Sequence, residues 1–171
     1  MKPASRLLMH LMMLLVAGCT YAAQPSTSVV SKGETRLMFT AGHLSALVRI
    51  TTHEMQIGKA SDHRSAVVQS NCTYSRHPCS IVDRIDITVN GNPLFIPRSV
   101  FCGLADLNRA DVKVDEERLI LTLYGGDASE SFIAKIEFDE ARVMRRTILV
   151  NGNSGFEPSQ ETVYHTVILG D

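Results

Sequence analysis

The chain of 171 residues contains no tryptophan, only 6% aromatic residues and almost no net charge, with 17 Lys and Arg against 18 Asp and Glu. Nucleic-acid binders need a clustered surplus of Lys and Arg, so this balance argues against nucleic acid as a partner. No apolar run approaches the roughly 18 residues of a membrane-spanning helix, and no fixed repeat is visible. A hydrophobic content of 44% predicts one globular domain with at most a short appendage.

Motifs for catalysis and metal binding are also scarce. The chain has no Gly-x-Ser-x-Gly nucleophile elbow and no Cys-x₂-Cys pair. His53 and Glu54 resemble the start of a zincin His-Glu-x-x-His motif, but Ile57 stands where the second histidine is required. Glu137 and Asp139 could act as a general acid and nucleophile, although acids at strand ends are usually solvated. We therefore expect no enzyme activity, no cofactor and no metal.

The N-terminus has the organisation of an export signal. Lys2 and Arg6 precede an apolar run over residues 7–17. A helix over this run would span roughly 16 Å, against about 30 Å of bilayer hydrocarbon, so a retained transmembrane anchor is not expected. The pattern is typical of a cleaved signal peptide.

The end of this run, from Leu15 to Cys19, resembles the lipobox of bacterial lipoproteins. The resemblance implies cleavage after Gly18 and acylation of Cys19, and Thr20 at the next position favours the outer membrane, with the body facing the periplasm. An ordinary signal peptide cut before Gln24 is the alternative. The expected organisation is a signal peptide over 1–18, a lipidated tether over 19–33 and an all-β domain over 34–171.

Export to an oxidising compartment favours disulfides. With Cys19 lipidated, Cys72, Cys79 and Cys102 remain, and three pairings are possible. We favour Cys72 with Cys79, because only six residues separate them and a short loop brings the thiols together often. Cys102 is then expected to be a buried free thiol.

Period-two alternation of apolar residues predicts antiparallel strands along most of the body. Asn90 and Gly91 form the preferred pair for a type I′ hairpin, and prolines at 93 and 97 predict a short or edge return strand. Residues 62–78 break the alternation and are expected to form a long loop, whereas residues 98–108 resemble a short helix. The predicted strands cover residues 43–51, 81–90, 93–97, 112–115, 119–124, 132–138, 143–150 and 162–169. The expected fold is an antiparallel meander of seven to nine strands in a sandwich or open barrel, with one short helix.

Arg142, Arg145 and Arg146 place three positive charges along one predicted strand. They suit contact with an acidic partner, or equally a surface charge ladder beside Glu137.

Two further resemblances concern the body. Residues 89–147, with the Pro97-Arg98-Ser99 turn and the Gly126-Asp127 hairpin, resemble uncharacterised exported proteins of proteobacteria. A signal, a small all-β body and a disulfide also make the chain similar to periplasmic lysozyme inhibitors and immunity lipoproteins. Some of those inhibitors insert a Ser-Gly loop with a nearby Tyr into an enzyme cleft, and here Ser154 and Gly155 are followed by Phe156.

The sequence thus predicts a non-catalytic envelope lipoprotein that binds a periplasmic protein partner as an inhibitor, immunity or assembly protein. The expected contact residues lie in two loops, residues 73–78 and 151–160, each with one aromatic residue. Phe156 is expected to point outward with Ser154 and Gly155, whereas the disulfide ring is expected to fold Tyr74 inward. The alternative is an envelope hydrolase with an acid or histidine site that no motif reveals.

Overall fold

The computed structural model describes residues 26–57, 72–74, 76–116 and 118–165. The signal peptide and lipobox expected from the sequence lie outside these residues, as do Cys19 and most of the loop expected over 62–78. No helix among the described residues is long and apolar enough to cross a membrane.

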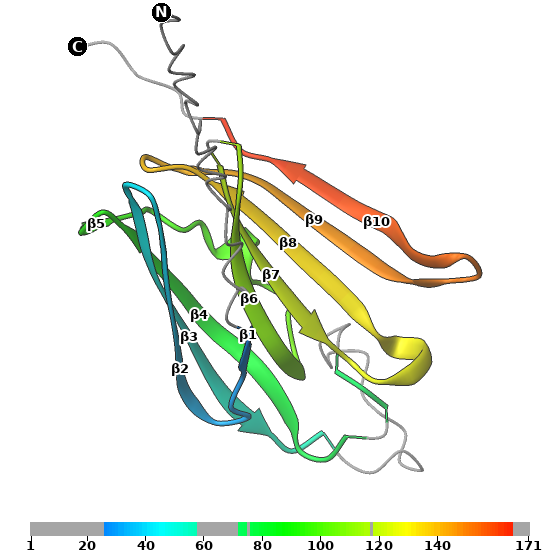
Figure 1. Ribbon diagram of the computed structural model, residues 1–171. Coiled ribbons are helices and arrows are strands. Elements are labelled where there is room, and N and C mark those ends of the chain that lie inside the picture. Colours follow the sequence, from blue (N-terminus) through cyan, green and yellow to red (C-terminus); the bar gives the residue numbers. More distant parts are fainter. Residues whose placement is uncertain (1–25, 58–71, 75, 117, 166–171) are drawn as a thin grey trace, which may run out of the picture.

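Two antiparallel sheets make up the fold (Figure 1), which confirms the all-β prediction. Each sheet is mainly a meander of consecutive strands. The four-stranded sheet contains, in spatial order, β2 (Gly33–Ala41), β3 (Leu44–Met55), β4 (Cys79–Val89) and β5 (Asn92–Pro93). The six-stranded sheet contains β1 (Ser26–Ser28), β6 (Leu107–Asp115), β7 (Arg118–Gly125), β8 (Phe132–Phe138), β9 (Val143–Gly152) and β10 (Gly155–Val163).

Alternating burial creates one core between the two sheets. Every second residue of β8 is buried, from Phe132 to Phe138, and β3 shows the same period from Leu44 to Ile50. Side chains of both sheets belong to one apolar cluster that includes Ile50, Ile85 and Phe138. The alternation of apolar and polar residues in the sequence therefore reflects a sheet with one face toward the core.

The Asn90-Gly91 hairpin forms as predicted. Both residues have positive φ, 49° and 82°, as a type I′ turn requires, and Val89 pairs with Asn92. The return strand β5 is short and lies at the sheet edge, in keeping with Pro93. After it, residues 94–106, which we call the strap, lead from the four-stranded sheet to β6 of the six-stranded sheet.

The structure differs from the sequence prediction in its count of strands and its helical content. It has ten strands in the described residues rather than seven to nine, because the sequence patterns did not predict β1 and β2. The helix expected over 98–108 is only a 3₁₀ turn, η1 (Arg98–Val100), since β6 begins at Leu107. A second 3₁₀ turn, η2 (Ala128–Glu130), precedes β8.

The two ends of the body also differ in detail from what the sequence suggested. Ser26–Ser28, within the segment expected to be tether, pairs with Asp111, Ala110 and Arg109 as strand β1. At the other end, the loop expected over 151–160 is a tight hairpin between β9 and β10, and β10 begins well before residue 162. Nearly all of β10 is exposed, so no alternation of burial marks it in the sequence.

Candidate functional site

The disulfide predicted from the sequence joins Cys72 and Cys79, with 5.7 Å between their Cα atoms. The buried carboxylate of Asp106 accepts hydrogen bonds from the backbone N–H groups of Thr73 and Ser80, at 2.7 and 2.8 Å. The two sulfurs and this carboxylate lie within 4.8 Å of one another. Because both sulfurs are oxidised, they offer no thiolate to a metal, and the arrangement anchors the loop to the body.

Tyr74 points outward, so the expectation that the ring folds inward was wrong. Its residue surface is 53% exposed, and its backbone N–H donates to Glu130 Oε2 at 2.8 Å. Asp106 holds the backbone of Thr73, the residue just before Tyr74. The contact with Glu130 fixes this loop against η2.

The β9–β10 hairpin carries the other predicted contact residues. Ser154 lies in the turn, Gly155 opens β10 with a φ of 112°, and Phe156 is 45% exposed. Phe156 pairs with Asn151, whose backbone N–H and side-chain amide donate to the carbonyls of Ser131 and Ala128.

The turn η2 therefore connects the two predicted loops. Glu130 holds Tyr74 on one side, while Ala128 and Ser131 hold the partner of Phe156 on the other. Figure 1 shows η2 at the end of the six-stranded sheet, before β8, with the β9–β10 hairpin projecting beside it. The structure thus brings Tyr74, Ser154, Gly155 and Phe156 to one end of the molecule.

Strand β10 forms an open edge of the six-stranded sheet. It pairs with β9 on one side, and no described strand follows it in the sheet. Phe156 and Val163 are exposed apolar residues near its two ends, and the register shifts by one residue between Pro158 and Gln160. An exposed edge strand offers unpaired backbone groups to another chain.

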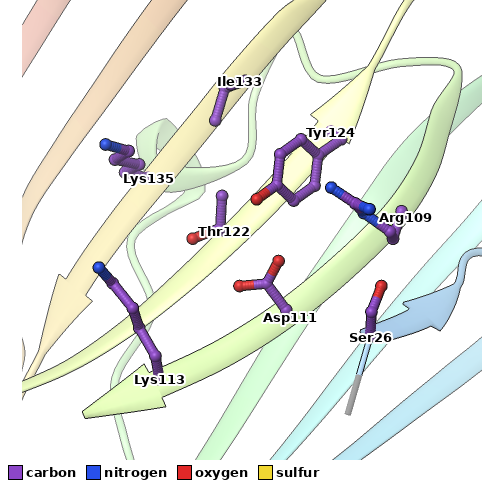
Figure 2. Close-up of a pocket in the computed structure, with 8 residues that line it drawn as sticks. All are labelled: Ser26, Arg109, Asp111, Lys113, Thr122, Tyr124, Ile133 and Lys135. Carbon is purple, nitrogen blue, oxygen red and sulfur yellow. The ribbon is translucent and has the colours of Figure 1, made fainter. Parts of the chain in front are cut away.

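The outer face of β6, β7 and β8 holds a cluster that the sequence analysis missed (Figure 2). The Arg109 guanidinium lies 4.0 Å from the centroid of the Tyr124 ring, a cation–π contact. Lys113 and Lys135 line the same shallow depression, and Asp111 is its one acidic residue. In the sequence, Arg109, Asp111 and Lys113 alternate along one strand, which places them on one face of the sheet. Their proximity to Tyr124 depends on the register between β6 and β7.

The environment of Tyr124 favours its neutral form. Burial raises the pKa of the Tyr124 hydroxyl above 10.0, and the negative charge and hydrogen bond of Asp111 raise it further, against an opposing contribution from Arg109. Figure 2 shows Asp111 directed toward the hydroxyl end of the ring. The hydroxyl therefore stays protonated to a higher pH than an ordinary tyrosine hydroxyl does.

Cys102 is exposed, which corrects the expectation of a buried thiol. Its neighbours Val100 and Leu104 are fully buried, so they take the core-facing positions of the strap. Cys102 lines a cavity of about 410 Å³ together with His53 and Asp83, whose Nδ1 and Oδ1 atoms are 2.6 Å apart. Among the described residues, no hydrogen bond joins the imidazole to the thiol.

The other acids considered for catalysis have structural partners. Glu137 lies between Arg118 and Arg145, at 3.7 and 3.9 Å. Asp139 accepts the backbone N–H groups of Ala141 and Arg142 and so closes the β8–β9 turn. Of the three arginines along this stretch, only Arg145 forms the expected ladder beside Glu137.

No family model, curated protein or solved structure matches this chain.

Proposed function

We propose that this chain is a non-catalytic lipoprotein of the bacterial envelope, anchored by lipid at Cys19 in the outer membrane, that binds a periplasmic protein partner. The observation that carries the proposal is the exposed end formed by Tyr74 and the Ser154-Gly155-Phe156 tip. Aromatic side chains commonly anchor protein interfaces, where a few residues supply most of the binding free energy. The open edge of β10 beside this tip gives a partner backbone groups to pair with.

The lipid anchor supports this role because it holds the body at one membrane. Cys19→Ser is expected to abolish incorporation of radioactive palmitate and to release the protein from the membrane fraction. Palmitate incorporation that persists in this variant contradicts the lipobox interpretation.

Site-specific photo-crosslinking tests the binding surface. A benzoylphenylalanine placed at position 156 in the producing cell is expected to give one major protein adduct. Phe95 is the matched control, because it is a phenylalanine of the strap and 82% exposed. Adducts of the same size and yield from both positions, or none from position 156, overturn the assignment of this end as the binding surface.

An envelope hydrolase is the second candidate, favoured by the His53–Asp83 hydrogen bond in a cavity that Cys102 also lines. A carboxylate that holds one imidazole nitrogen orients the other as a general base. A hydrolase of this kind should cleave a model thioester, and both Cys102→Ser and His53→Gln should abolish the cleavage. Cleavage that is absent, or that persists in both variants, argues against the hydrolase.

A further inference from the structure

Two adjacent arginines of β9 occupy opposite environments. Arg145 Nη1 lies 3.3 Å from Glu161, and its Nε lies 3.9 Å from Glu137. Arg146 is only 5% exposed, and no carboxylate among the described residues comes within 4.0 Å of its guanidinium. The exposed arginine is thus paired twice, whereas the buried one has no counter-charge within residues 26–57, 72–74, 76–116 and 118–165.

Neutral acceptors satisfy Arg146 only in part. Its Nη1 donates to Gln160 Oε1 at 2.9 Å, and its Nη2 reaches the Cys102 carbonyl at 3.4 Å, a long hydrogen bond. The buried Nε has no hydrogen-bond partner in the part of the chain that the structure describes. Burial also lowers the pKa of Arg146, because desolvation disfavours the charged form, yet arginine keeps its charge in proteins. A buried charge without a counter-ion destabilises the free protein.

Arg146 lines a cavity of about 670 Å³ between the β9–β10 hairpin and the strap. This volume lies within the range of small-molecule pockets. Arg98 adds a second positive charge to its lining, and no acidic residue belongs to the lining. Polar groups come from Ser99, Ser159, Gln160 and Thr162, and apolar surface comes from Ile148 and Val150.

We propose that this cavity binds a small aliphatic carboxylic acid, with its carboxylate on Arg146 and its alkyl chain along Ile148 and Val150. A carboxylate matches the planar guanidinium group of Arg146. Its oxygens can accept hydrogen bonds from Nη2, whose present hydrogen bond to the Cys102 carbonyl is long. The neighbouring hydroxyl groups supply further donors. The apolar strip distinguishes this ligand from a fully hydrated inorganic anion, which gains nothing from contact with Ile148.

This site does not depend on the partner proposed above, because none of Tyr74, Ser154, Gly155 and Phe156 lines the cavity. A result that rules out the protein-binding surface therefore does not rule out the carboxylic-acid site, and the reverse also holds.

Calorimetric titration with sodium octanoate tests the site, using the full chain with Cys19→Ser so that no protein-bound lipid competes. Octanamide is the neutral control of equal length, and sodium acetate is the anionic control without a chain. We expect both controls to bind at least ~10-fold more weakly than octanoate. Equal binding of octanoate and octanamide, or no octanoate binding, overturns the proposal.

The two arginines provide matched variants. Arg146→Gln is expected to weaken octanoate binding at least ~10-fold while keeping or raising Tm, because it removes an uncompensated buried charge. Arg145→Gln is expected to leave octanoate binding unchanged. Equal losses in both variants, or a fall in Tm with unchanged affinity in Arg146→Gln, show that Arg146 is structural.

A third variant covers the case in which Arg146→Gln does not fold. Arg98 is exposed, so Arg98→Gln leaves the core intact, and it is expected to weaken octanoate but not octanamide binding. Unchanged octanoate affinity in Arg98→Gln, when Arg146→Gln cannot be measured, also overturns the proposal.

Discussion

The carboxylate of Asp106 receives the backbone N–H of Ser80 at 2.8 Å, directly after the second cysteine of the disulfide. The same carboxylate receives the N–H of Thr73 at 2.7 Å, so one side chain fixes both ends of the disulfide loop. Both hydrogen bonds are buried.

Asp106→Ala should therefore be strongly destabilising. Each of the two orphaned buried donors costs about 1–3 kcal/mol, so we expect the free energy of unfolding to fall by roughly 2–6 kcal/mol. Denaturant unfolding measures this loss. Asp115→Ala, at the exposed end of β6, is the control and should change the stability by less than about 0.5 kcal/mol. Similar losses in the two variants contradict the anchoring role of Asp106.

Cys102 should react in the native protein. Because the thiol is exposed, iodoacetamide is expected to modify one cysteine of the folded Cys19→Ser chain, and Cys102→Ser should remove that mass shift. Intact-mass spectrometry counts the modified thiols. Modification that requires denaturant contradicts the exposed position, and modification of more than one thiol contradicts the Cys72–Cys79 disulfide.

Tyr124 should ionise at a higher pH than an ordinary tyrosine. Burial and Asp111 raise its pKa, so the ultraviolet absorbance of tyrosinate should show one late-titrating residue that Tyr124→Phe removes. Asp111→Asn should bring the pKa down, whereas Arg109→Gln should raise it further, because Arg109 opposes the shift. Shifts in the same direction in both variants contradict this account.

The same shift has a consequence for stability. Since the pKa is higher in the folded than in the unfolded chain, the stabilisation is complete below the unfolded value of about 10. It is lost as the pH rises from there through the folded pKa. Tyr124→Phe should therefore flatten part of the decline in unfolding free energy at alkaline pH.

Phe156→Ala should change binding and leave stability nearly untouched. The ring lies half exposed on a strand that the core does not cover, so we expect less than about 1 kcal/mol of destabilisation. Adduct formation or affinity for the partner should fall at least ~10-fold, about 1.4 kcal/mol. Phe138→Ala, at a fully buried position, should instead cost about 3–5 kcal/mol. A comparable stability loss at position 156 identifies its ring as packing.

Sequence patterns revealed the strands that lie over the core. The alternation around Ile50 and Ile85 predicted β3 and β4, and the Asn90-Gly91 pair predicted the hairpin after β4. Strand β2 also alternates, with Leu37 and Phe39 buried, so the sequence carries the same pattern there. Strand β10 was misplaced for a physical reason, since a strand exposed on both faces needs no periodic pattern.

The sites depend on register, which the sequence does not specify. Arg109 lies over Tyr124 because β6 and β7 pair these two residues across the sheet. Neighbouring residues of a strand face opposite sides, yet the sequence alone does not say which of Arg145 and Arg146 meets solvent. The buried position of Arg146 requires the strap to pass beside β9, a contact between segments more than 40 residues apart.

In the proposed lipoprotein, the position of strand β1 limits the distance between the membrane and the folded domain. With the lipid on Cys19, only six residues separate the acylated cysteine from Ser26, the first residue fixed in the sheet. At about 3.5 Å per residue, this linker can span no more than roughly 25 Å between the bilayer surface and Ser26. In the proposed anchoring, the β1 edge lies on the membrane-proximal side, and the β10 edge lies five strand spacings, or about 24 Å, across the sheet from it. The proposal therefore requires that a partner bound at the hairpin tip lies close to the membrane.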